Sequence, residues 1–141
     1  MRLTMRLAAA DAQQTLGELA ESEKLPEPTV AKLLGQLRRG GVVDAVRGRN
    51  GGYVLAGTAD QTTAAAILRS VATRPPFGYP CQEKEDSADC TWYHECGLRP
   101  VWQLLERRVM HVLETTTVAD MLKKEALVAE HLESAWPASP E

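Results

Sequence analysis

A glycine-rich turn between two short apolar runs constrains the fold of this chain more than any other feature. Residues 42–46 and 53–56 have the composition of β-strands. The segment between them is Arg47-Gly48-Arg49-Asn50-Gly51-Gly52. Its Asn-Gly pair is a strong signal for a tight connection between antiparallel strands. The sequence therefore predicts a β-hairpin over residues 42–56.

Three short helical patterns precede this hairpin. The first covers residues 3–14. The second begins at Thr15, with Glu18 three positions later, which is the arrangement of a capping box. The third starts near Pro28, a residue favoured in a first helical turn, and ends at a glycine pair that begins with Gly40. Helix, turn, helix and hairpin in this order predict a winged helix-turn-helix.

The remainder of the chain also has helical patterns. Residues 63–72 predict an amphipathic helix, and a longer helix begins at Pro100. Apolar residues occupy so much of the longer helix that we expect it to be covered on two sides, one of them by a partner subunit. A short segment over 117–122 and a helix-prone tail from 123 to about 136 follow. The predicted fold class is mainly α with a small β-hairpin.

These patterns divide the chain into four parts. We expect a winged helix-turn-helix DNA-binding domain over residues 1–73 and a cysteine loop over 74–99. A dimerisation helix with its return segment would occupy 100–124, and a C-terminal tail 125–141.

The charge of the chain is unevenly distributed. The formal net charge is −3, yet the segment from Pro28 to Gly57 contains five cations and only one anion, Asp44. The charge of a local face, rather than the total, sets how a surface attracts a partner. The basic segment therefore predicts a nucleic-acid interface.

The helix and the hairpin supply the candidates for DNA contact. A recognition helix enters the major groove, while a wing places cations over phosphates or the minor groove. The candidates are Pro28, Thr29, Lys32, Gln36 and Arg38 on the helix, Arg47, Arg49 and Asn50 on the wing, and the turn glycines Gly48, Gly51 and Gly52. The simpler interpretation is that Gln36 is only exposed to solvent and that the arginines lie in a solvated turn, without a role in DNA binding.

All three cysteines, Cys81, Cys90 and Cys96, lie within one stretch of 16 residues. The intervening sequence is too polar for a buried core, so thiolate ligation is favoured. An iron–sulfur cluster, a zinc ion and a bare redox thiol switch are the alternatives. A tetrahedral site needs a fourth ligand, and His94 would complete a zinc site of three cysteines and one histidine.

Other functions have less support in the sequence. There is no apolar stretch near 18 residues, and the N-terminal segment is too briefly apolar for a secretory signal. We therefore expect a cytoplasmic protein that does not contact a membrane. Thiols stay reduced in the cytoplasm, so we expect the cysteines to bind a metal rather than to form disulfides. No Ser/His/Asp set and no phosphate loop is present, so we do not expect an enzyme.

Together these motifs resemble a known family of winged-helix transcription factors that includes the iron–sulfur cluster regulator IscR and the nitric-oxide-sensitive repressor NsrR. The resemblance covers roughly residues 1–122. It rests on 16–20, 30–34 and 37–43, and most specifically on 46–55, which reads Val-Arg-Gly-Arg-Asn-Gly-Gly-Tyr-Val-Leu. The resemblance implies a homodimer whose cysteines carry a 2Fe–2S or 4Fe–4S cluster.

The same resemblance implies a role for the first helix. In that family it can donate an acidic fourth ligand to the cluster of the partner subunit, and Asp11 would stand for it here, out of register. The implied function is a DNA-binding transcriptional regulator, with repression as the favoured sense, that responds to redox state, nitric oxide, oxygen or iron–sulfur status. A zinc-stabilised or thiol-switched repressor and an accessory protein that does not bind DNA are the alternatives.

Overall fold

The computed structural model describes residues 1–10, 12–48, 51–72, 92 and 95–135. The elements run in the order α1 (Arg2–Ala9), α2 (Leu16–Glu23), α3 (Glu27–Arg39), β1 (Val43–Val46), β2 (Gly52–Leu55), α4 (Ala64–Val71), α5 (Leu98–Thr115), α6 (Val118–Met121) and α7 (Glu125–Ala135). This order confirms the predicted class, mainly α with one small hairpin.

Local signals set the ends of α2 and α3. The Glu18 N–H donates to the Thr15 hydroxyl at 3.3 Å, and the Thr15 N–H donates to the Glu18 carboxylate at 2.7 Å. This is the predicted capping box. Helix α3 holds Pro28 in its first turn and is followed by Gly41 at φ +70, a conformation that favours glycine.

Helix α1 is shorter than its sequence pattern predicted. We expected a helix over residues 3–14, but it ends at Ala9, and Ala10 is extended. The backbone of Gln14 instead pairs with Tyr53 of β2, through hydrogen bonds of 3.1 and 2.8 Å in the two directions. This pairing satisfies backbone groups of Gln14 that a longer helix would have used.

The hairpin is antiparallel, with Val43 opposite Leu55 and Val46 opposite Gly52. Both strands lie within one residue of their predicted bounds. A Cβ atom at Gly52 would lie 2.7 Å from the Gln14 carbonyl oxygen. Glycine is therefore required where the α1–α2 connection crosses the hairpin.

The core lies where α1 to α4, β1 and α6 meet. It contains Leu3, Leu7, Leu19, Ala20, Val30, Leu34, Leu37, Val42, Val43, Ile67 and Val118. Val118 belongs to α6, which packs against this core after α5 has left it. The Ala64 N–H donates to the Thr116 carbonyl at 2.8 Å, and the Val118 N–H donates to the Thr62 carbonyl at 2.8 Å. These bonds hold the C-terminal end of α5 beside the start of α4.

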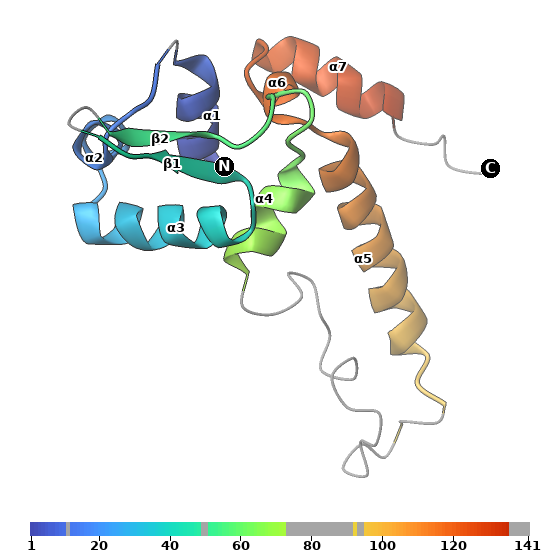
Figure 1. The fold of residues 1–141 in the computed structure, drawn as a ribbon. Coiled ribbons are helices and arrows are strands. Elements are labelled where there is room, and N and C mark those ends of the chain that lie inside the picture. Colours follow the sequence, from blue (N-terminus) through green and yellow to red (C-terminus); the bar gives the residue numbers. More distant parts are fainter. Residues whose placement is uncertain (11, 49–50, 73–91, 93–94, 136–141) are drawn as a thin grey trace.

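Helix α5 extends away from the part of the molecule formed by α1 to α4 and the hairpin (Figure 1). It packs against α4, yet none of its residues is buried. Trp102 and Leu105 are 43 and 48% exposed, and neighbouring apolar residues are similar. Among the described residues, no helix combines the length and apolarity that crossing a bilayer requires.

Candidate nucleic-acid interface and cysteine segment

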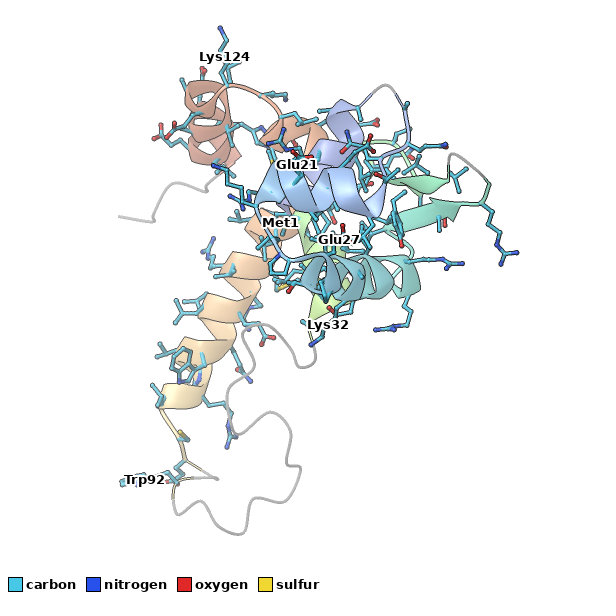
Figure 2. The ribbon with its side chains drawn as sticks, turned by 90° about the vertical axis from the view of Figure 1, so that its left-hand side faces the viewer. Met1, Glu21, Glu27, Lys32, Trp92 and Lys124 are labelled. Carbon is cyan, nitrogen blue, oxygen red and sulfur yellow. The ribbon has the colours of Figure 1, made fainter. Side chains whose placement is uncertain are left out.

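Helix α3 has a buried face and an outer face. Val30, Leu34 and Leu37 are buried, whereas Pro28 and Lys32, one turn apart, are exposed. Figure 2 shows Lys32 pointing away from the other helices. Both residues are predicted DNA contacts, and the outer face presents them to solvent as that prediction requires.

The remaining candidates on α3 divide between the outer face and the interior. Thr29 and Arg38 are exposed. Gln36 is half-buried, and its side-chain amide lies 3.5 Å from the carbonyl oxygen of Val71 at the end of α4. Gln36 therefore has a partner inside the protein, which neither its predicted DNA contact nor simple solvent exposure anticipated.

Arg39 is a residue of the outer face that the sequence analysis did not select. It is exposed in the last turn of α3, beside Arg38. Its position seven residues after Lys32, which is two helical turns, was the available signal. Cations there also interact favourably with the negative end of the helix dipole, which is their simpler role.

The wing presents its first arginine to solvent. Arg47 is exposed and directly follows β1. Gly48 has φ +134, and its carbonyl accepts the Gly51 N–H at 3.0 Å. A Cβ atom at Gly51 would lie 2.6 Å from the Val46 carbonyl oxygen, so the turn is closed tightly by glycine. The other two wing candidates, Arg49 and Asn50, lie outside the described residues.

The predicted metal ligands fall mostly outside the described residues. Cys81, Cys90, His94 and Asp11 all do so. Cys96 is described as a half-buried free thiol, immediately before Gly97, the N-cap of α5. Among the described residues, no three His, Cys, Asp or Glu side chains come together as a metal site.

The last turn of α4 lies between α3 and α5 and contacts both helices. Arg69 forms an ion pair with Glu114 of α5. Next to it, Ser70 packs so closely on the end of α3 that a Cβ atom at Gly40 would lie 2.2 Å from its own Cβ. Val71 is the residue whose carbonyl faces Gln36. Of these three consecutive residues, Arg69 contacts α5, and Ser70 and Val71 lie against the end of α3, just before the predicted cysteine loop.

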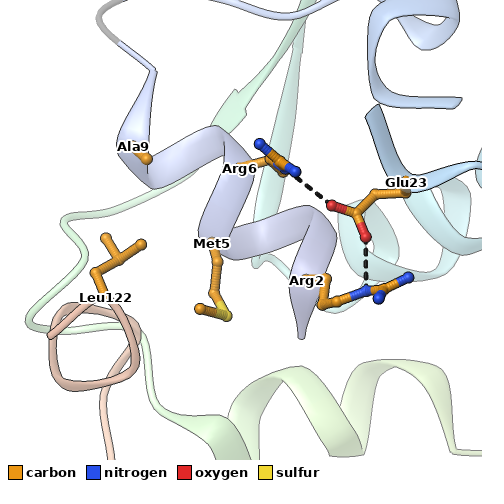
Figure 3. A pocket seen from close by; sticks show the side chains of 6 residues that line it. All are labelled: Arg2, Met5, Arg6, Ala9, Glu23 and Leu122. Atoms are coloured by element: carbon orange, nitrogen blue, oxygen red, sulfur yellow. Dashed lines mark hydrogen bonds and ion pairs between the residues drawn. The ribbon is translucent and has the colours of Figure 1, made fainter. Parts of the chain in front are cut away.

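A cavity of about 280 Å³ lies between α1, α2 and α6 (Figure 3). The Glu23 carboxylate, whose side chain is 5% exposed, forms an ion pair with Arg2 at 2.6 Å and accepts a hydrogen bond from Arg6 at 2.9 Å. Both arginines in the lining are therefore paired with one carboxylate. This arrangement ties α1 to α2 and leaves one net positive charge among the three side chains.

The sequence is similar to those of known transcriptional regulators. Residues 1–124 match the Rrf2 family, described as iron-dependent transcriptional regulators. A putative HTH-type transcriptional regulator of Synechocystis is 34% identical over 107 residues, which cover 73% of this chain and 67% of that protein. The HTH-type transcriptional regulator IscR of Yersinia pseudotuberculosis is 27% identical over 131 residues, which cover 89% of this chain and 74% of that protein.

Solved structures show the same likeness. CymR of B. subtilis, the global cysteine regulator, superposes with a TM-score of 0.66 at 28% identity, covering 85% of this chain and 87% of that one. IscR of T. potens superposes with a TM-score of 0.64 at 27% identity, covering 98% and 85%. The relatives carry names of transcriptional regulators, not of enzymes, which agrees with the expectation from the sequence.

Proposed function

Because the chain belongs to the Rrf2 family of transcriptional regulators, we propose that it binds DNA as a homodimer under the control of a cysteine-ligated iron–sulfur cluster. The observation that carries this proposal is the position of α4. Its last turn contacts α3 on one side and α5 on the other, and it directly precedes the predicted cysteine loop. A change in the conformation of that loop would act on the recognition helix α3 through the last turn of α4, which contacts it.

The exposed side of α5 supports the homodimer. Its apolar side chains near the N-terminal end are about half exposed: Leu98, Val101, Trp102, Leu104 and Leu105. Burying such a stripe against a second copy is favourable, at roughly 25 cal/mol for each Å² of apolar surface. A dimer would also present two copies of α3 to half-sites about 34 Å apart.

The chemistry of the cysteines supports the cluster. Thiolates are the usual protein ligands of iron–sulfur clusters, and Cys81, Cys90 and Cys96 would hold one here. Cys96 precedes the N-terminus of α5, where the helix dipole favours a negatively charged ligand. A bound cluster would supply a centre sensitive to redox state and to small molecules such as nitric oxide or oxygen. His94, or Asp11 from the partner, would complete the ligand set.

A thiol-responsive regulator without a cluster is the second candidate. The likeness to CymR, named a global cysteine regulator, is as strong as the likeness to IscR of T. potens. In this alternative the three cysteines would act through thiol oxidation rather than through iron. Repression, as the favoured sense, is common to both.

Anaerobic purification separates these candidates. We expect a coloured protein that contains iron and acid-labile sulfide, and whose visible absorption is lost in a Cys96→Ser variant. Colourless protein with three titratable thiols would support the thiol switch instead. A colourless protein loaded with zinc would replace the cluster by a structural metal site.

A further inference from the structure

Before its last turn, which holds Arg39, the outer face of α3 carries one long side chain among small ones. Pro28, Ala31 and Lys32 are exposed, and Gly35 is partly exposed. A Cβ atom at Gly35 would meet nothing within 4 Å, so the surface there is open. Of these four residues, only Lys32 extends well beyond the backbone.

The longer polar side chains nearby are directed elsewhere. Glu27 lies between α2 and α3 in Figure 2, and its carboxylate oxygen is 3.6 Å from where a Cβ atom of Gly17 would be. Gln36 is directed toward the Val71 carbonyl. Lys32 itself has no ion-pair partner among the described residues. Its ammonium group is therefore available to a ligand.

Lys32 lies in the N-terminal half of α3, the part of a recognition helix that contacts base edges in helix-turn-helix proteins. Arg39 lies seven residues further on, which is about 10 Å along the helix axis. The major groove is about 12 Å wide. Two cations this far apart contact different parts of the duplex, and Lys32 is the one in the part of the helix that reads bases in helix-turn-helix proteins.

We propose that Lys32 is the specificity-determining residue of the recognition helix and that it selects a guanine in each half-site. This inference rests on the proposed function, namely that α3 enters the major groove of DNA. An ammonium group only donates hydrogen bonds, and guanine offers two acceptors there, O6 and N7. Adenine offers one acceptor beside a donor, so it is a poorer partner.

The small neighbours of Lys32 support this role. Side chains as short as those of Ala31 and Gly35 let the helix backbone approach the base edges closely, which brings the ammonium group within reach of O6 and N7. The Ala31 methyl group can also contact a thymine methyl group. The selected half-site should therefore contain a guanine with a thymine near it.

Selection from a library of random duplexes tests the proposal. Wild-type protein is expected to enrich a guanine placed symmetrically in both half-sites, and Lys32→Ala to lose the preference at that position only. Replacing this guanine by 7-deazaguanine removes the N7 acceptor. It should weaken wild-type binding about tenfold and leave Lys32→Ala binding unchanged.

Arg39→Ala is the matched control, because it removes an exposed cation from the same helix. It is expected to weaken binding to every duplex and to reduce the slope of log affinity against log salt by about two, one for each subunit, with the guanine preference intact. Lys32→Ala and wild type should unfold at the same temperature, since Lys32 is exposed.

Two results would overturn the inference. Lys32→Ala could retain the guanine preference, or it could weaken all duplexes equally with the same loss of salt slope as Arg39→Ala, which would make Lys32 a phosphate contact. If wild-type protein bound no duplex in a salt-dependent manner, the proposed function would fail, and this inference with it.

Discussion

The two wing arginines are the residues whose predicted role depends most on charge alone. Arg47 is exposed beside the glycine turn, and Arg49 follows it by two positions. We expect Arg47→Ala and Arg49→Ala each to weaken binding to all duplexes and to reduce the salt slope by about 1.8, the value for two phosphate contacts, one from each subunit of the dimer. Titrations at several salt concentrations measure both effects. A slope equal to that of the wild type would remove the substituted arginine from the phosphate contacts.

Glu23 is a second residue with a definable energetic role. Its nearly buried carboxylate pairs with Arg2 and Arg6, which hold α1 against α2. Glu23→Gln removes the charge that both arginines share, but they are largely exposed and can return to water. We therefore expect a loss of about 1–2 kcal/mol in the free energy of unfolding.

Denaturant unfolding measures this loss, and Glu21→Gln is the control. Glu21 is exposed on the same helix, so its substitution should change the stability by less than about 0.5 kcal/mol. Equal effects of the two substitutions would show that the ion pairs of Glu23 contribute nothing specific.

At the scale of single elements, α6 depends on its capping box. Asp120 accepts a hydrogen bond from the Thr117 N–H at 3.0 Å and from Lys123 at 2.7 Å. The hydrogen bonds from Lys123 and then Thr117 hold the pKa of Asp120 well below its usual value. A depressed pKa favours the folded state above the unfolded pKa of about 3.9, and this contribution is lost as the pH falls toward the folded pKa.

This pKa makes a pH-dependent prediction. Asp120→Asn should be less stable than the wild type at pH 6 by about 0.5–1 kcal/mol. The difference between the two proteins should shrink as the pH falls from 4 toward 2. Unfolding at a series of pH values measures it, with Asp44→Asn as an exposed control. A difference that stays constant with pH would contradict the role of the ionised carboxylate.

The helices also show where sequence reasoning succeeds and where it fails. Thr15 and Glu18 are adjacent enough in sequence that their capping box, and hence the start of α2, could be predicted. The end of α1 could not, because Gln14 pairs with Tyr53, far along the chain. Nothing local indicates the approach of Gln36 to Val71 either, and its predicted DNA contact stays a prediction. Long-range contacts override local patterns in both cases.

For the whole molecule, the exposed stripe on α5 predicts the oligomeric state. Leu105 is 48% exposed and does not belong to the described core. We expect Leu105→Asp to convert a dimer into a folded monomer, because it would place a charge in the apolar interface. Sedimentation velocity measures the mass, and circular dichroism checks that the helices remain.

Leu127→Asp is the matched control for this change. Leu127 is a similarly exposed leucine, 52%, but it lies on α7. The variant should remain dimeric. If Leu127→Asp dissociated the protein and Leu105→Asp did not, the interface would lie on α7 instead of α5.

We infer that the ligand state of the cysteine segment controls the DNA affinity of the whole molecule. The most direct test is the Kd for one selected duplex, at fixed salt, with protein reconstituted with iron and sulfide and with the same protein after chelation. We predict that the two Kd values differ at least about fivefold, within the usual range of coupling between sites. The ratio should fall to one in Cys96→Ser. A ratio of one in the wild type, or a ratio that Cys96→Ser leaves unchanged, would show that a cluster on these cysteines does not control DNA binding.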